Sequence, residues 1–266
     1  MTIKELVQTY QKGGFTRPQA ESNAAQEIIL RKIASSPLCD KVLLKGGVVM
    51  YNITNNNRRA TQDLDFDFVR YDISNDESID FFVSLLNDTD KHLVIKRIGK
   101  VKTLHQADYK GKRVQLSISD STYELFIHLD IGVHTLMAIE QTNIIFTFNQ
   151  GDISIKLNAN PIEQIVAEKL VSLAKHNYLS TRFKDIGDIY YLINNCKVNK
   201  NTILKCIELF LLNDLKGKTL YDFILSIEMA LNDSTFADGY QMSQSTWIDE
   251  EYGVIRDSII NFLYSL

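Results

Sequence analysis

The pattern of hydrophobic and polar positions predicts two helices and two strands in the first 70 residues. Small and apolar residues recur at helical spacing between residues 17 and 34, and Pro18 stands where a first helical turn accepts proline. The apolar run KVLL predicts a short buried strand, and a helix is expected to open directly after it at GGVVMYNI. A polar loop, TNNNRRATQ, then leads to a second strand, DLDFDFV.

The second strand alternates apolar and acidic side chains. Successive residues of a strand point to opposite faces of a sheet. The apolar face is expected to hold Leu64, Phe66 and Phe68, and the acidic face Asp63, Asp65 and Asp67. One side of this strand is therefore expected to pack in the core while the other collects negative charge.

A series of strands is expected after a further helix at residues 79–87. The runs with β-like patterns are HLVIKRIG, TLHQADY, RVQLSIS, ELFIHLDIGV, IIFTFN and DISIKL. Three of the separating segments, YKGK, SDST and NQGD, have the composition of hairpin turns. Much of this part of the sheet is therefore expected to be antiparallel.

The period of the pattern becomes helical after residue 160. The segment NPIEQIVAEKL predicts a helix start, with Asn160 as N-cap, Pro161 at the first helical position and Glu163 in the first turn. Further helices are expected at residues 185–195, 202–212, 220–231 and 247–263. The fold class is therefore expected to be α+β, with a mixed α/β domain over residues 1–160 and an all-helical domain over residues 161–266.

Composition narrows the class of protein. The chain has 266 residues, of which 45% are hydrophobic, and this is enough to bury a substantial core. Its three cysteines are far apart and odd in number, which predicts neither a disulfide framework nor a zinc site. No run approaches about 18 apolar residues, so we expect a cytoplasmic protein without a membrane span. A formal net charge of -4 means that nucleic-acid binding would need a local basic patch.

Two features between residues 46 and 65 predict chemistry. Asp63 and Asp65 are two apart, so on a strand their carboxylates lie on one face, about 7 Å apart, and both can reach one divalent cation; an acidic edge strand is the alternative. Gly46 and Gly47 open a helix after a strand and leave backbone N–H groups accessible to a phosphate, although such pairs also occur in turns. Together they predict metal-assisted phosphoryl or nucleotidyl transfer.

These residues resemble a known family. Gly46-Gly47 followed by RATQDLD, residues 59–65, is similar to the signature of the AbiEii/AbiGii toxin family, within the DNA polymerase β-like nucleotidyltransferase superfamily. LFIHLDIGV resembles the later strand that carries the third carboxylate, and AEKLVSLAKHNYLSTRFKDIGDIYYL resembles the family segment EKL...R...RD..DLY.L. The resemblance covers about residues 40–195. It implies a polymerase β-like nucleotidyltransferase core with a mixed sheet, followed by a helical domain.

The resemblance implies a metal site built from three carboxylates. Asp63, Asp65 and Asp130 would hold two Mg²⁺ ions, and Asp130 would also help to deprotonate the attacking hydroxyl. Asp67 continues the alternation and is expected to lie beyond the site. His128 precedes Asp130 by two residues, shares its strand face and is a further candidate.

The resemblance also implies contacts with the triphosphate of an NTP. Gly46, Gly47 and Arg59 would make these contacts, and Arg58 is the competitor for the role of Arg59. Many members of the superfamily have serine at the second glycine position. Gly47 therefore offers only its backbone.

The helical part adds a lysine and two acids. Lys169 falls within the apolar stripe of its helix, where an inward lysine usually has a partner; a snorkelling side chain is the alternative. The resemblance places this lysine in the active site, where it would neutralise phosphate. It also implies a helical aspartate, which maps best to Asp185, with Asp188 on the same helix face as the second candidate. A lysine-pairing or capping acid is the alternative for both.

A basic segment separates the predicted metal ligands. It contains Lys91, Lys96, Arg97, Lys100, Lys102, Lys110, Lys112 and Arg113, with Asp108 as its one acid. On hairpins such a run can bind an RNA backbone, and a solvated outer face is the more common alternative.

The resemblance favours a Mg²⁺-dependent nucleotidyltransferase that acts as the toxin of a bacterial toxin–antitoxin or abortive-infection system. It implies NTP as donor, an RNA acceptor with the tRNA 3′ end as one candidate, and a separate antitoxin protein. The alternatives are transfer to a small molecule or a protein, and a noncatalytic member that binds nucleotide or a partner. The three carboxylates favour an enzyme. A DxD glycosyltransferase would explain neither the paired glycines nor the segment around Lys169.

Overall fold

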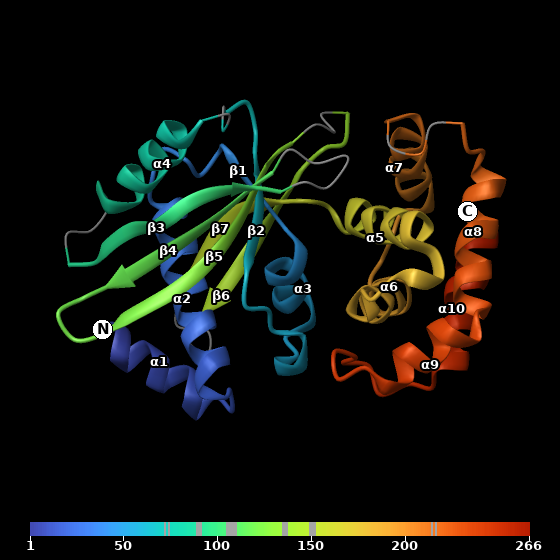
Figure 1. Ribbon diagram of the computed structural model, residues 1–266, viewed down its shortest axis with the longest axis horizontal. Coiled ribbons are helices and arrows are strands. Elements are labelled where there is room, and N and C mark those ends of the chain that lie inside the picture. Colours follow the sequence, from blue (N-terminus) through green and yellow to red (C-terminus); the bar gives the residue numbers. More distant parts are fainter. Residues whose placement is uncertain are drawn as a thin grey trace. The chain divides into compact units, whose positions relative to one another are not determined.

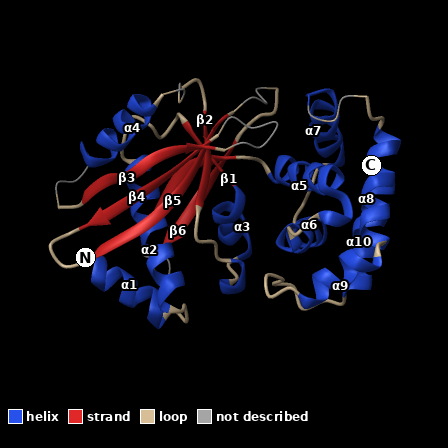
Figure 2. Cartoon of the chain, viewed as in Figure 1, coloured by secondary structure: helices blue, strands red, loops and turns tan. Residues whose placement is uncertain are grey.

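The chain forms two compact units, Met1–Asn160 and Pro161–Leu266. The computed structural model describes residues 1–71, 73, 75–88, 92–104, 111–134, 138–148, 153–213, 215 and 217–266. Within these residues the first unit combines a seven-stranded sheet with helices, and the second is helical (Figures 1 and 2). The fold is α+β.

The sheet of the first unit is mixed. Its strands are β1 (Val42–Lys45), β2 (Leu64–Phe68), β3 (Val94–Thr103), β4 (Lys112–Ser119), β5 (Glu124–Val133), β6 (Thr142–Phe148) and β7 (Ile153–Ala159), in the spatial order β3-β4-β5-β2-β1-β7-β6. The pairs β3/β4, β4/β5 and β6/β7 are antiparallel, which confirms the expected hairpin pattern. β1 pairs antiparallel with β2, and parallel pairs join β2 to β5 and β1 to β7. The expected segments TLHQADY, YKGK and NQGD lie wholly or partly outside the described residues.

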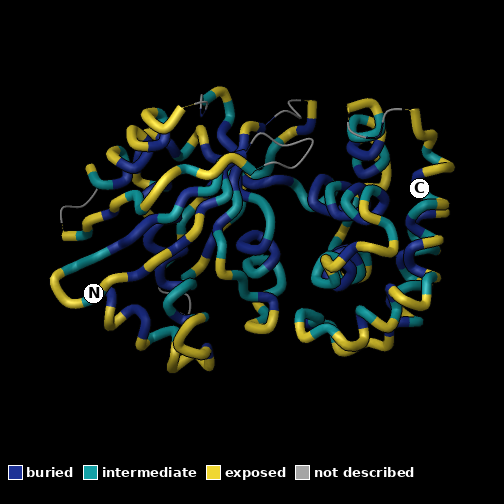
Figure 3. The backbone as a smooth tube through the Cα atoms, in the orientation of Figure 1, coloured by how far each residue is buried: buried dark blue, intermediate teal, exposed yellow. Residues whose placement is uncertain are grey.

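Helices of the first unit pack on one face of this sheet. They are α1 (Ile3–Lys12), α2 (Arg17–Ala34), α3 (Gly46–Thr54) and α4 (Asp76–Asp88). α2 contacts β5 and β7, and α4 contacts α2 and β3. The rings of Phe66 and Phe68 lie 5.8 and 5.4 Å from that of Phe82 on α4, so the apolar face of β2 is covered as expected. β1 and β2 are mostly buried (Figure 3), and the acids of β2 belong to the face opposite Phe66 and Phe68.

One boundary in the first unit differs from the expectation. β2 begins at Leu64, and Asp63 lies in the bend before it, so the expectation that Asp63 belongs to the strand is wrong. The reason is a side chain on α2. Gln26 Nε2 donates to the backbone oxygens of Thr61 and Asp63 at 2.9 and 3.3 Å, so a side chain and not a neighbouring strand satisfies these carbonyls. Helix α1 begins with a capping box formed by Thr2 and Glu5, and it has no counterpart among the predicted elements.

The second unit is built from six described helices. They are α5 (Ile162–His176), α6 (Phe183–Asn195), α7 (Lys200–Asn213), α8 (Leu220–Asn232), α9 (Ser234–Met242) and α10 (Tyr252–Tyr264). α5 contacts α6, α7 and α8, and α10 contacts α6 and α8. α9 was not expected. No helix among the described residues is long and apolar enough to cross a membrane.

Two helix starts in the second unit differ from the expectations. The N-cap of α5 is Pro161 and not Asn160, because the Asn160 N–H donates to Leu44 O at 3.0 Å and continues the pairing of β7 with β1. The helix expected from residue 247 begins at Tyr252. Trp247 lies before it, with its indole Nε1 donating to Asp188 at 3.0 Å, which places this residue by a side-chain contact instead of a helical one.

Candidate active site

Four charged residues form a row across the acidic face of the sheet. Asp65 on β2 lies directly opposite Asp130 on β5 and, on its other side, opposite Lys45 on β1. Arg113 on β4 lies opposite Asp130. Residues directly opposite each other on adjacent strands point to the same face. The row therefore reads Arg113, Asp130, Asp65 and Lys45, with two acids side by side and a cation at each end.

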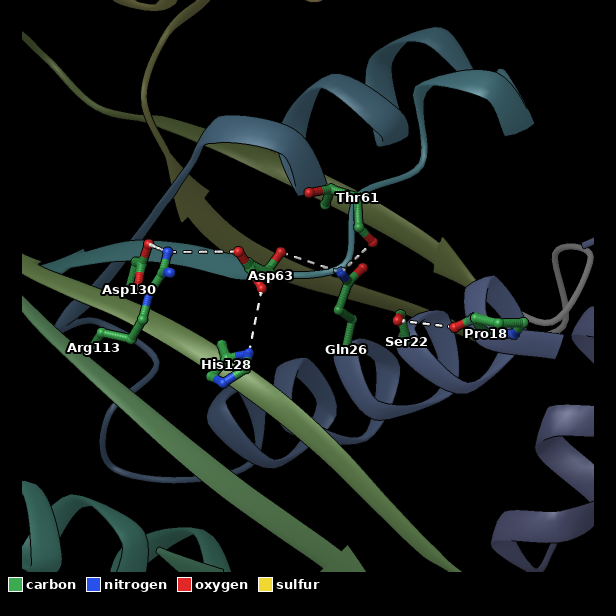
Figure 4. Close-up of polar contacts among 8 residues, drawn as sticks. All are labelled: Pro18, Ser22, Gln26, Thr61, Asp63, Arg113, His128 and Asp130. Atoms are coloured by element: carbon green, nitrogen blue, oxygen red, sulfur yellow. Dashed lines mark hydrogen bonds and ion pairs between the residues drawn. The ribbon is translucent and has the colours of Figure 1, made fainter. Parts of the chain in front are cut away.

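Arg113 neutralises two of the three predicted metal ligands. Its guanidinium donates to both carboxylate oxygens of Asp130 at 2.7 and 2.5 Å, and its Nη2 lies 3.6 Å from Asp63 Oδ2 (Figure 4). The hydrogen bonds to Asp130 raise the pKa of Arg113, so this side chain stays charged. A permanent cation thus lies between the carboxylates of Asp63 and Asp130.

The surroundings of Asp65 disfavour its charged form. Burial, followed by the charges of Asp130 and Asp63, raises its pKa to about 6. Lys45 and a hydrogen bond from the Gly47 N–H act in the opposite direction. A carboxylate that is buried beside other carboxylates is stabilised by any cation that approaches it.

The two glycines are required by close contacts. Gly46 has a φ of 67°, and a Cβ there would lie 2.4 Å from Asp65 Oδ2. A Cβ at Gly47 would lie 2.6 Å from the Cβ and 2.8 Å from Oγ1 of Thr61. A serine at position 47 therefore has no room, and the hydroxyl of Thr61 lies beside the position that its side chain would take.

Sequence patterns missed two residues that support the site. Gln26 is 4% exposed and fixes the backbone of Thr61 and Asp63, and no local pattern distinguishes it from other polar residues of α2. Lys45 donates to Asp67 at 2.5 Å and also favours the charged form of Asp65. Its place directly before the glycine pair was the available signal. Asp67 is thus paired with a cation and lies one alternation further along β2.

The remaining candidates of the first unit differ in exposure. Arg59 is 4% exposed, in a single 3₁₀ turn over Asn57–Arg59, whereas Arg58 is exposed. His128 Nδ1 lies 3.8 Å from Asp63 Oδ1, so this histidine does reach the acids. The sheet therefore brings together Gly46 and Gly47 with the three carboxylates and His128.

The candidates of the helical unit form a cluster of their own. Lys169 Nζ lies 2.5 Å from Asp185 Oδ1 and 2.8 Å from Asp188 Oδ2, so the inward lysine has two acidic partners. The side chain of Asp188 is fully buried and also accepts from Trp247, whereas that of Asp185 is 18% exposed. The two acids thus differ in access to a ligand.

The described residues of the basic segment have different partners and exposures. Lys91 and Lys110 lie outside the described residues. Arg97 makes two hydrogen bonds to Asp80, Lys112 contacts Thr103, and Arg113 belongs to the acidic row. The exposed lysines of β3 are Lys96, Lys100 and Lys102. Because β3 is an edge strand, charge there also discourages pairing with another sheet.

The acids of the row are candidate ligands for a divalent cation. Among the described residues, no group of three His, Cys, Asp or Glu side chains stands close enough together to hold a metal, and Arg113 occupies the space between Asp63 and Asp130. Carboxylate oxygens are nevertheless the ligands that Mg²⁺ prefers. Burial and the charges of Asp130 and Asp63 raise the pKa of Asp65, so a cation beside these carboxylates would favour the charged form of Asp65.

The contact between Gly47 and Thr61 leads to a stability prediction. We expect Gly47→Ala to lower the free energy of unfolding by about 1–3 kcal/mol, because the added methyl group overlaps the branched Cβ of Thr61. Gly253→Ala is the matched control, because its added Cβ in α10 would meet nothing within 4 Å apart from its chain neighbours and the backbone of its own helix. The free energy of unfolding of this variant should stay equal or rise by up to about 1 kcal/mol, since alanine is the better helix former. Equal thermal midpoints for the two variants would contradict the contact.

The raised pKa of Asp65 leads to a pH prediction for the metal-free protein. The folded state binds this proton more tightly than the unfolded state, so Asp65 lowers stability as pH rises toward and through about 6. Asp65→Asn removes this loss. Relative to the wild type, the variant should gain about 1.4 kcal/mol between pH 5 and pH 8, measured by urea unfolding in EDTA. A difference that does not change with pH would show that Asp65 is an ordinary carboxylate.

Comparisons with known proteins identify the family of the chain. A sequence model of the family described as "Nucleotidyl transferase AbiEii toxin, Type IV TA system" matches residues 28–250. No curated protein matches the sequence. A crystal structure named "putative nucleotidyltransferase from H. pylori" has 17% sequence identity and a TM-score of 0.50, with 94% of this chain and 98% of that chain covered, which shows a shared fold. For JHP933 from Helicobacter pylori the identity is 15% and the TM-score 0.49, with 94% and 95% covered. The chain therefore belongs to the AbiEii nucleotidyl transferase toxin family of type IV toxin–antitoxin systems.

Proposed function

We propose that this nucleotidyltransferase transfers a nucleoside monophosphate from an NTP to an RNA hydroxyl in a Mg²⁺-dependent reaction, and so acts as the toxin of its pair. The observation that carries the proposal is the direct opposition of Asp65 and Asp130 next to the glycine-rich start of α3. Adjacent carboxylates for metal and a helix N-terminus for phosphate are the two parts that nucleotidyl transfer needs.

The metal would be held by Asp63, Asp65 and Asp130. Two bound Mg²⁺ ions would stabilise charge on the attacking and leaving oxygens. Arg113 has to leave Asp130 before that carboxylate can act as a ligand or accept the proton of the attacking hydroxyl. Once released, its guanidinium is suited to bind a phosphate of the NTP or of the acceptor.

The triphosphate would lie at the N-terminus of α3. Glycine at positions 46 and 47 keeps side chains away from this helix start, and the Gly47 N–H now donates to Asp65. The Thr61 hydroxyl, beside the Gly47 Cα, is placed to donate to the same phosphates in place of a serine at position 47. Arg59 keeps its proposed role as a phosphate ligand, and Arg58 remains the exposed competitor.

From the helical unit we propose Lys169 and Asp185 as participants. The amine of Lys169 is held by two carboxylates, which restricts its rotamers. Asp185 retains an exposed fraction of 18%, whereas Asp188 has none. This difference favours Asp185 as the functional acid and gives Asp188 the role of positioning Lys169.

The acceptor is proposed to be RNA, with the tRNA 3′ end as the first candidate. The exposed lysines of β3 support this choice, because lysines at an edge can contact a phosphate backbone. An NTP donor and an RNA acceptor both imply a cytoplasmic site of action. The type IV family implies an antitoxin partner, which we propose to be a separate protein.

A transfer assay tests the proposed reaction. Purified protein with Mg²⁺, each of the four labelled NTPs and total tRNA should incorporate label, and Asp65→Asn should lower incorporation at least about 100-fold, because it removes a metal ligand without changing the side-chain shape. Lys169→Met and Thr61→Val should also lower incorporation. Charge reversal at Lys96, Lys100 and Lys102 should weaken transfer to tRNA and leave transfer to a small molecule unchanged. Failure to label RNA with any NTP, by protein that melts cooperatively, would refute the proposal.

The position of Arg113 predicts a metal response that does not depend on activity. Arg113→Gln should lower the thermal midpoint in EDTA, because Asp63 and Asp130 lose their shared cation. It should also raise the gain in thermal midpoint on addition of Mg²⁺, since the metal no longer competes with a guanidinium. Arg97→Gln is the matched control, because Arg97 makes the same two-bond contact with Asp80. Equal Mg²⁺ responses in both variants would contradict a metal site at these acids.

A further inference from the structure

A cavity lies in the first unit, apart from the charged row. It has a volume of about 610 Å³ and is lined by residues of α1, α2, α3 and β6, elements that can be followed in Figure 1. Of the site residues above, only Gln26 lines it. Cavities of this size hold ligands of the size of a nucleoside or a small drug.

The lining combines aromatic rings with side-chain amides. The rings come from both strands and helices, with Phe146 on β6, Tyr51 on α3 and Tyr10 on α1, and the hydroxyl of Tyr10 is held by Glu27. The amides are mainly asparagines, such as Asn23 and Asn52. None of the described residues that line the cavity is charged. A phosphate or a metal ion would find no counter-charge from these residues, and an aliphatic ligand would leave the amides unpaired.

One amide in the lining lacks a partner. Asn23 on α2 is 4% exposed, and its Nδ2 has no hydrogen-bond partner among the described residues. Asn52, by contrast, donates its Nδ2 to Ile145 O at 3.1 Å, which leaves its carbonyl oxygen as an acceptor. A buried donor without a partner calls for an explanation such as a ligand or an ordered water. The residues that line the cavity thus include a buried amide donor without a described partner and an amide acceptor, together with aromatic rings.

We propose that this cavity binds a nucleobase. Planar heteroaromatic rings stack on aromatic side chains, and asparagine and glutamine amides pair with the donor and acceptor groups on the edges of bases. A neutral base matches the uncharged lining, whereas the charged phosphates belong to the row at Asp65. The base can come from a free nucleoside or nucleotide, or from a nucleotide of an RNA chain.

The cavity is connected to the charged row through one side chain. Gln26 lines the cavity and also donates to the backbone oxygens of Thr61 and Asp63. α3 lines it through Tyr51 and begins at Gly46, beside Asp65. A base in the cavity therefore lies beside Gln26, the residue that holds the bend before β2.

Equilibrium dialysis of the whole chain tests this site. Four labelled nucleosides and a mixed-sequence RNA octamer are measured in EDTA, so that metal-dependent triphosphate binding does not contribute. At least one nucleoside should bind with a dissociation constant on the order of 0.1 mM. Asn23→Leu and Tyr51→Leu should each weaken this binding by at least about tenfold, because the first removes the amide and the second an aromatic face. Asp65→Asn is the matched control and should bind equally well.

The outcomes separate the sources of the base. A base within an RNA chain is supported if the octamer binds much more tightly than any nucleoside and Asn23→Leu weakens this binding. A free nucleoside is supported if the octamer binds equally well or more weakly. Absence of saturable binding by every probe overturns the proposal. So does binding that is the same in both cavity variants but lost in Asp65→Asn. Because no transfer reaction is measured, either result leaves the transferase assay to be judged separately.

Discussion

The close approach of Asp65 and Asp130 is the constraint around which the charged row of the first unit is arranged. The parallel pairing of β2 with β5 places these two carboxylates directly side by side, and burial adds to the cost of the charge on Asp65. The protein compensates from the outer strands, with Arg113 on β4 and Lys45 on β1. Burial, together with the charges of Asp130 and Asp63, nevertheless raises the pKa of Asp65. A further cation beside these carboxylates would favour the charged form of Asp65.

The backbone around this row is held by contacts that leave little freedom. Gly46 approaches Asp65 so closely that a side chain is excluded, and Gly47 approaches Thr61 in the same way. Gln26 fixes the other side of the same loop by bonding two carbonyls. Because Gln26 also lines the cavity beside α3, one residue connects the proposed transfer site with the proposed base site.

In the helical unit the central charge is positive and the compensating side chains are acidic. There a buried cation, Lys169, is compensated by two acids, and the more buried acid, Asp188, takes a second hydrogen bond from Trp247. Contact with two carboxylates gives this lysine a defined position. Both units thus hold charged side chains in place by pairing them with charge from a neighbouring element.

The sequence by itself determined the elements whose signal is local. The alternation of β2, the glycine pair at α3, the hairpins and the helical period after residue 160 all follow from neighbouring residues, and the family motif identified the enzyme class. Tertiary structure decided what depends on residues far apart in the chain. Gln26 moved Asp63 out of β2, Leu44 prevented Asn160 from capping α5, and strand order placed Arg113 on Asp130. No local pattern encodes these contacts, because each joins side chains or backbone groups that only the assembled sheet brings together.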